Sequence, residues 1–231
     1  MIIKVFTLGR PGSGKSTAAE QLAKVAWNRG LSVRHIDDYR ILLEMAQWDT
    51  AHAQFRPTVY GGFDVLDFSV LDEALKQVRR EVLEVYEERA SKDIQLVTIE
   101  FARDNYQAAL KLFDDGFLRD NTYFIFVEAD LNRCIERVSA RNFSLQQPDE
   151  QDGTEHYVSE YILRSYYARD DVGDALRRYL AGRGVHPNKV KLIANRGSAQ
   201  CFRSEVARVI DEIFDGIPQV ASAAPRLAPT G

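Results

Sequence analysis

The sequence predicts an α/β fold in which a five-stranded parallel sheet carries helices on both faces. Short apolar runs rich in β-branched residues recur along the chain, and segments with apolar residues at helical spacing separate them. A glycine-rich segment follows the first run directly. Strands that alternate with helices form parallel sheets, because each connection must cross over the sheet. The predicted strands are residues 2–8, 31–36, 93–100, 122–129 and 189–194.

Composition limits the class of protein. With 231 residues, of which 45% are hydrophobic, the chain can build one main domain. The formal net charge of −4 gives no general basic surplus, so nucleic acid is a less favoured partner than a small molecule. The two cysteines, Cys134 and Cys201, have no metal or redox spacing, and we see no secretory or membrane-spanning segment. We therefore expect a cytoplasmic protein with no membrane partner; its oligomeric state stays open.

The first strand leads into the strongest motif of the chain. Residues 2–8 read IIKVFTL, typical of a buried parallel strand, and residues 15–30 carry Ala18, Leu22 and Ala26 at helical spacing. Between the two, residues 9–16 match the pattern G-x-x-x-x-G-K-S. A strand before this pattern and a helix after it are the context of a P-loop. The fold is therefore predicted to be that of a P-loop NTPase.

The P-loop predicts the donor half of a phosphoryl-transfer site. Its glycines allow several backbone N–H groups to point at a polyphosphate, and the helix N-terminus adds partial positive charge. Lys15 is expected to reach the β- and γ-phosphates as a catalytic cation, while the hydroxyl of Ser16 binds Mg²⁺. The implied cofactors are ATP or GTP with Mg²⁺. The predicted nucleotide-binding residues are Gly9, Gly12, Ser13, Gly14, Lys15, Ser16 and Thr17.

The second strand ends in HIDDYR, which places Asp37, Asp38 and Arg40 at the carboxyl edge of the sheet. Ligands of open α/β sheets collect at this edge. A carboxylate there can take the proton of an attacking hydroxyl, and an arginine can hold an anionic group of the acceptor. One of the two acids can instead cap the following helix.

Residues 41–90 are longer than a simple crossover and predict a helical insertion that covers the acceptor. Its second half, residues 67–90, reads as one long amphipathic helix. The aromatic residues near the insertion can stack on a base or build a small core of their own. They are Tyr39, Trp48, Phe55, Tyr60 and Phe63.

A lid region is expected over residues 130–170, after the fourth strand. Arg133, Arg137 and Arg141 recur every fourth residue and so lie near one face of a helix, ahead of a polar loop at residues 142–157. Such arginines either close over bound phosphates or form a solvated face that pairs with acids such as Glu136.

Together these segments resemble a known family. TLGRPGSGKST, followed by IDDYR, resembles the polynucleotide 5′-hydroxyl kinases and their relatives among the small P-loop kinases. That group includes zeta-type toxins, shikimate and gluconate kinases and nucleoside monophosphate kinases. The resemblance implies that Asp37 is the general base and that Arg40 contacts a phosphate of the acceptor.

The resemblance extends to the later strands. It implies that Arg137 and Arg141, which match the R-x-x-x-R form of lid arginines, are catalytic. Glu100, at the end of the third strand, takes the place of the Asp that many members carry as a metal ligand, with Ser16 as the other ligand. Glu100 and Arg103 form an E-x-x-R pattern similar to that of deoxynucleoside kinases, in which such a pair attends the sugar hydroxyl. Asp38, Arg40 and Arg103 are the predicted acceptor-binding residues.

The predicted function is an ATP-dependent phosphotransferase that moves the γ-phosphoryl group to a hydroxyl of a nucleoside, a nucleic-acid end or a small metabolite. The rival prediction is a P-loop NTPase that acts as a nucleotide-dependent switch or binding module. The kinase domain is expected to span residues 1–215. Residues 216–231, low in charge and rich in Ala and Pro, predict a disordered tail.

Overall fold

The computed structural model describes residues 2–58, 62–87, 95–144 and 158–217. At its centre lies a five-stranded sheet with the order β2-β5-β1-β6-β7, in which every pair of neighbours is parallel. The sheet and its helical layers confirm the predicted fold class. The strands are β1 (Ile2–Leu8), β2 (Ser32–Asp37), β5 (Gln95–Phe101), β6 (Thr122–Glu128) and β7 (Val190–Ala194).

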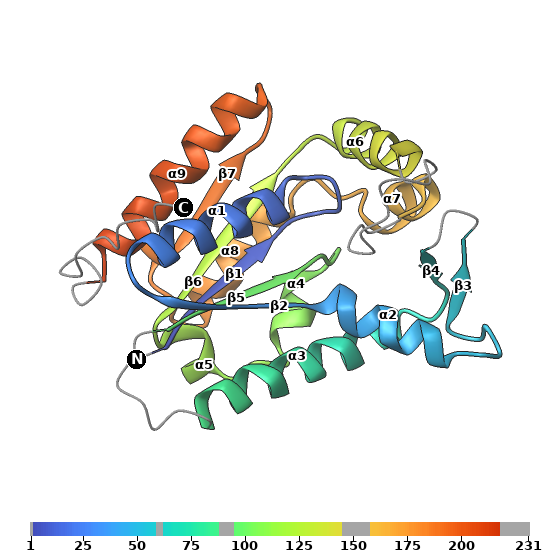
Figure 1. Cartoon of the computed structure of the whole chain (residues 1–231), viewed down its shortest axis with the longest axis horizontal. Helices are drawn as coiled ribbons and strands as arrows, with labels where there is room; N and C mark the ends of the chain where they lie inside the picture. Colours follow the sequence, from blue (N-terminus) through green and yellow to red (C-terminus); the bar gives the residue numbers. More distant parts are fainter. Residues whose placement is uncertain (1, 59–61, 88–94, 145–157, 218–231) are drawn as a thin grey trace, which may run out of the picture.

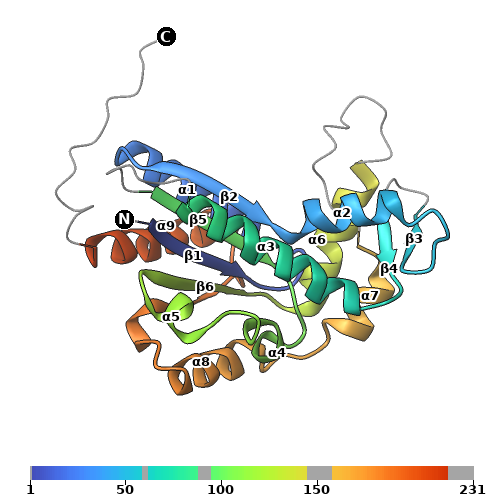
Figure 2. The same cartoon turned by 90° about the horizontal axis from the view of Figure 1, so that it is seen from below.

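Helices cover the sheet on both faces (Figures 1 and 2). One face packs against α1 (Lys15–Asn28) and α9 (Ala199–Asp215), which bury their apolar sides in a common core with the sheet. The other face packs against a second group of helices in the larger core. These are α3 (Ser69–Glu87), α4 (Tyr106–Leu110), α5 (Asp115–Arg119) and α8 (Val172–Gly182). A short 3₁₀ turn, η1 (Pro187–Lys189), leads into β7.

The central strand positions the phosphate-binding loop. β1 pairs with β5 on one side and β6 on the other, and all seven of its residues are buried. A strand covered on both faces needs apolar side chains in both directions, which explains why five of its seven residues, all but Lys4 and Thr7, are apolar. The loop that follows Leu8 therefore leaves the middle of the sheet at its carboxyl edge, where ligands of this architecture bind.

The segment 41–90 divides into two parts with different roles. α3 packs on the sheet with α2 (Asp38–Trp48) and places Val70, Leu75 and Val82 in the larger core, so it is a crossover helix of the main domain and not part of a separate subdomain. The projecting part is an antiparallel hairpin of β3 (Phe55–Pro57) and β4 (Phe63–Val65). The sequence prediction did not include this hairpin.

The lid region contains two helices, α6 (Leu131–Ser144) and α7 (Glu160–Tyr166). Ile135 and Val138 of α6 pack with Leu163 of α7 in a small cluster separate from the two cores. α6 continues through Ser144, so the polar segment predicted as a loop begins as helix. The remainder of that segment, residues 145–157, lies outside the described residues.

Two further predictions lie largely outside the described part of the chain. Of the tail at residues 216–231, only Gly216 and Ile217 are described, and Ile217 is buried against the α1 and α9 core. Tyr60 also falls in an undescribed segment. Within the described ranges, no helix has the length and apolar character needed to cross a membrane.

Candidate active site

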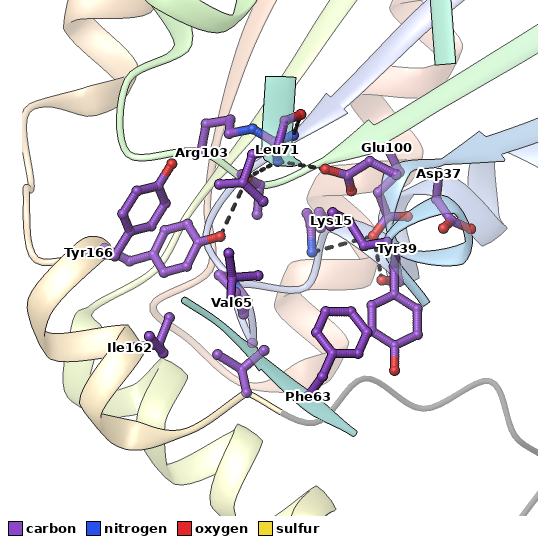
Figure 3. Close-up of a pocket in the computed structure, with 18 of the residues that line it drawn as sticks. Lys15, Asp37, Tyr39, Phe63, Val65, Leu71, Glu100, Arg103, Ile162 and Tyr166 are labelled. Carbon is purple, nitrogen blue, oxygen red and sulfur yellow. Dashed lines mark hydrogen bonds and ion pairs between the residues drawn. The ribbon is translucent and has the colours of Figure 1, made fainter. Parts of the chain in front are cut away.

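A cavity of about 360 Å³ opens at the carboxyl edge of the sheet. Its lining comes from the P-loop, the starts of α1 and α2, the hairpin strand β4, the end of β5, and the lid helices α6 and α7. Figure 3 shows Lys15 and Glu100 close together, with Tyr39 and Phe63 on one side of the cavity and Ile162 and Tyr166 on the other. Elements that are distant in the sequence thus meet around one site.

The P-loop adopts a conformation that only glycines accept readily. Gly9, Gly12 and Gly14 have φ angles of 149°, 77° and 105°. A Cβ atom at Gly12 would lie 2.6 Å from the carbonyl oxygen of Cys134, so the lid helix packs directly against the loop. No side chain caps the N-terminus of α1, and its first turn has no acidic residue. These features fit a polyphosphate, which would accept hydrogen bonds from the free amides.

Two residues from other elements hold the P-loop in place. The hydroxyl of Tyr106 accepts a hydrogen bond from the N–H of Gly9 at 2.9 Å and donates one to the carbonyl oxygen of Gly9 at 3.2 Å. The side-chain amide of Asn195 donates to the carbonyl oxygen of Ser13 at 2.7 Å. The sequence analysis assigned neither contact, because each joins positions far apart in the chain and no local pattern marks it.

Ser16, Lys15 and Glu100 form the centre of the donor half. The Ser16 hydroxyl donates to Glu100 Oε1 at 2.7 Å, and Lys15 Nζ lies 3.4 Å from the same oxygen. A hydroxyl and a buried carboxylate side by side are the oxygen ligands that Mg²⁺ prefers. Among the described residues no group of three or more His, Cys, Asp or Glu side chains forms a metal site. The pair therefore suits a Mg²⁺ ion that shares its coordination with nucleotide phosphates.

Asp37 and Asp38 both line the cavity but have different partners. Asp37 is the N-cap of α2: its Oδ1 accepts a hydrogen bond from the N–H of Arg40 at 2.9 Å. Asp38 is buried and pairs with Arg103, with 2.5 Å between Oδ2 and Nη1. Of the two acids, the one that caps the helix is therefore Asp37.

Arg103 is a buried cation whose hydrogen bonds tie three elements together. Besides Asp38 it donates to the carbonyl oxygens of Ala102 at 2.6 Å and Leu71 at 2.7 Å. Burial raises the pKa of Asp38, and the charge of Arg103 opposes part of that rise. Arg103 lines the cavity as predicted, but Asp38 neutralises its charge.

His35 lies between the carboxylates of Asp37 and Glu100. Its Nε2 lies 3.5 Å from Asp37 Oδ2 and 3.9 Å from Glu100 Oε2, and its Nδ1 lies 2.7 Å from the hydroxyl of Thr98. Burial alone would lower the pKa of His35, but the two carboxylates outweigh it and the pKa is raised. The sequence analysis gave His35 no role, because a lone histidine without ligand spacing carries no signal.

Arg40, which the sequence predicts as a clamp on the acceptor, is not among the residues that line the cavity. Its guanidinium pairs with Glu44 at 2.9 Å and with Glu81 at 2.6 Å, and half of its side chain is exposed. The physical reason is helical geometry. α2 begins at Asp38, so Arg40 lies in the first turn on the side that faces α3.

Two of the three arginines of α6 line the cavity. Arg137 donates to the carbonyl oxygen of Gly12 at 3.2 Å and to the side-chain oxygen of Asn195 at 3.2 Å, so it already contacts the P-loop. Arg141 lines the cavity one turn further along the helix. Arg133 points elsewhere and hydrogen-bonds the carbonyl oxygen of Arg196. The arrangement places two cations beside the predicted phosphates.

Comparison with known proteins is consistent with this fold. No protein-family model and no curated protein matches the chain. Among solved structures, Kti12 from Chaetomium thermophilum in complex with ADP-AlF3 is similar, with a TM-score of 0.54, 16% sequence identity, and coverage of 94% of this chain and 99% of that one.

Two further solved structures have lower TM-scores. A gluconokinase from Sinorhizobium meliloti 1021 has a TM-score of 0.48 with 14% identity, covering 94% of this chain and 95% of that one. Shikimate kinase from Acinetobacter baumannii in complex with shikimate has a TM-score of 0.45 with 14% identity, covering 95% of this chain and 94% of that one. The likeness to Kti12 agrees with the fold described above. At these identities the likeness concerns the fold alone.

Proposed function

We propose that the protein is a phosphotransferase that moves the γ-phosphoryl group of ATP or GTP to a hydroxyl of a second substrate, with Mg²⁺. One observation carries the proposal: the P-loop and the paired acids Asp37 and Asp38 line the same cavity. A nucleotide switch needs the first of these features but not an acceptor site next to it. The cavity of about 360 Å³ also extends to the hairpin strand β4 and to α7, which lie apart from the P-loop in the sequence.

The donor half binds and polarises the nucleotide. The amides of the P-loop and of the first turn of α1 would bind its phosphates, with Lys15 as the cation at the γ-phosphate. Ser16 and Glu100 are the residues that would hold Mg²⁺, which supplies charge neutralisation at the phosphates when bound. Arg137 and Arg141 line the same cavity, and in this scheme they stabilise the negative charge of the transition state.

The acceptor half supplies the base. The acceptor oxygen attacks the γ-phosphorus, the bond from that phosphorus to the β–γ bridging oxygen breaks, and the nucleoside diphosphate leaves. Asp37 takes the hydroxyl proton in this scheme. Asp38 is the weaker candidate, because accepting a proton would disrupt its buried pair with Arg103. Asp37 Oδ2 lies 3.5 Å from His35 Nε2, and a quarter of the Asp37 side chain is exposed.

The test is a screen for transfer of radiolabelled phosphate from ATP to a panel of alcohols, run with the parent protein and Lys15→Ala. We expect a labelled product with the parent and none with the variant, since the lysine is a phosphate ligand and not part of the core. Melting curves of both proteins control for folding. Equal product with Lys15→Ala would contradict the donor assignment. ATP hydrolysis by the parent with no labelled alcohol would favour the switch.

A further inference from the structure

The acceptor half of the cavity is bounded by a largely apolar surface, which we call the acceptor wall. Figure 3 shows its side chains around the space next to Lys15. The wall draws on α2, β4, α3 and α7, so it is built where the hairpin and the lid meet the sheet. Its members are Tyr39, Phe63, Val65, Leu71, Ile162 and Tyr166.

Two stacked aromatic pairs give the acceptor wall its flat surfaces. The rings of Tyr39 and Phe63 are stacked, with centroids 5.6 Å apart and planes 10° apart. Phe68 and Tyr166 are stacked in the same way, at 4.6 Å and 10°. Phe55, fully buried, packs edge-on against Phe63 at 5.1 Å and fixes the orientation of its ring. Fixed ring faces and edges favour a ligand with a flat ring of its own.

The charges around the acceptor wall do not suit an anion. Arg103 is neutralised by Asp38 and hydrogen-bonded to two carbonyl oxygens, and Arg40 does not line the cavity. Of the other cations in the described lining, Lys15 and Arg137 contact Glu100 and the P-loop respectively. A carboxylate or phosphate on the acceptor would also lie near Asp37, and like charges in a partly buried site repel each other.

Burial raises the pKa of Tyr39 and the charge of Arg141 opposes part of that rise, so Arg141 acts on a side chain of the acceptor wall. Arg141 lies on α6 one turn beyond Arg137 and lines the cavity, a position from which its charge can bind the transferred phosphoryl group. An anionic acceptor would have to compete with that group for Arg141. The variant Arg141→Ala therefore belongs in the test.

We infer that the acceptor is an uncharged alcohol that carries a flat ring, of which a nucleoside is one example, and not a phosphorylated or carboxylated compound. The inference rests on the proposed function and specifies its second substrate. The ring lies against the acceptor wall, and the hydroxyl faces Asp37 and the γ-phosphate.

The experiment compares kcat/KM for four matched groups of alcohols with Mg²⁺ and ATP. These are nucleosides, the corresponding nucleoside 3′-monophosphates, the uncharged polyols glucose and sorbitol, and gluconate. We expect the best nucleoside to exceed the polyols by about tenfold or more, the scale of one good stacking contact. It should also exceed its 3′-monophosphate, because Asp37 repels the added negative charge. A preference for the monophosphate or for gluconate, lost in Arg141→Ala, would overturn the inference and leave the proposed function intact.

Two wall variants and a matched control test the site itself. Phe63→Leu and Tyr166→Leu keep an apolar side chain but remove the ring, so KM for the nucleoside should rise about tenfold while nucleotide affinity stays unchanged. Trp48→Leu makes the same kind of change at a side chain that is 84% exposed and does not line the cavity, and should leave KM unchanged. Unaltered KM in both wall variants would overturn the inference.

A binding measurement separates failure of the inference from failure of the proposed function. Equilibrium dialysis of a radiolabelled nucleoside, with Mg²⁺ and a non-hydrolysable ATP analogue, does not depend on turnover. Binding that Phe63→Leu weakens supports the acceptor wall even if no alcohol in the panel is phosphorylated. If none of the nucleosides binds, the inference is wrong, whatever the protein phosphorylates.

Discussion

Asp37 and Asp38 are neighbours in the chain, yet one caps a helix and the other forms a buried ion pair. Because Asn caps helices about as well as Asp, Asp37→Asn should leave the melting temperature unchanged. The same change removes the basic oxygen, so phosphoryl transfer should fall about 10²-fold or more while nucleotide affinity survives. Transfer rates, nucleotide titration and melting curves check the three parts. Full transfer activity in Asp37→Asn would exclude it as the base.

Asp38→Asn has a different expected result, because it leaves the charge of Arg103 buried without a counter-charge. Breaking a buried pair in this way costs about 3–5 kcal/mol in the free energy of unfolding, measured by chemical denaturation. The double variant Asp38→Leu with Arg103→Met serves as a control, since removing both charges together should recover most of that loss. A fully stable Asp38→Asn with lost transfer would instead make Asp38 the base.

At the scale of elements, the close packing of α6 on the P-loop requires a glycine at position 12. Gly12→Ala forces a side chain into a backbone with a φ of 77° and against the carbonyl oxygen of Cys134. We expect a loss of at least about 1–2 kcal/mol in stability and weaker nucleotide binding, measured by denaturation and titration. Gly182→Ala is the matched control, because an added Cβ there meets nothing within 4 Å. Equal effects at both glycines would contradict this account.

The elements that could be predicted are those that a short, continuous stretch of sequence identifies by itself. The five strands and the P-loop were visible because each is a continuous run of characteristic residues. β3 and β4 were not, because three residues are too few to show an alternating pattern. The predictions for the site residues also succeeded only where the signal was local. Lys15, Ser16 and Glu100 come together as predicted, whereas Arg40 turned away because a helix begins two residues before it.

At the scale of the whole molecule, nucleotide binding should raise the free energy of unfolding and therefore the melting temperature. A ligand that binds only the folded state at about 100 times its Kd adds about 2.7 kcal/mol, which for a chain of this size raises Tm by about 5–10 °C. We expect this shift with Mg²⁺ and ATP, a smaller one after chelation of Mg²⁺, and none in Lys15→Ala. Scanning calorimetry measures all three. An unchanged Tm of the parent at saturating nucleotide would contradict the donor site.

The central place of β1 has a consequence for how the protein is made. Ile2 pairs with Gln95 and Lys4 with Thr122, so β1 has no sheet neighbour until roughly 90 further residues have been synthesised. Contacts between such distant positions give a high contact order, which slows folding. During that interval the apolar run of residues 2–8 stays exposed. The strand that leads into the P-loop is therefore also an apolar segment that chaperones can protect from aggregation during translation.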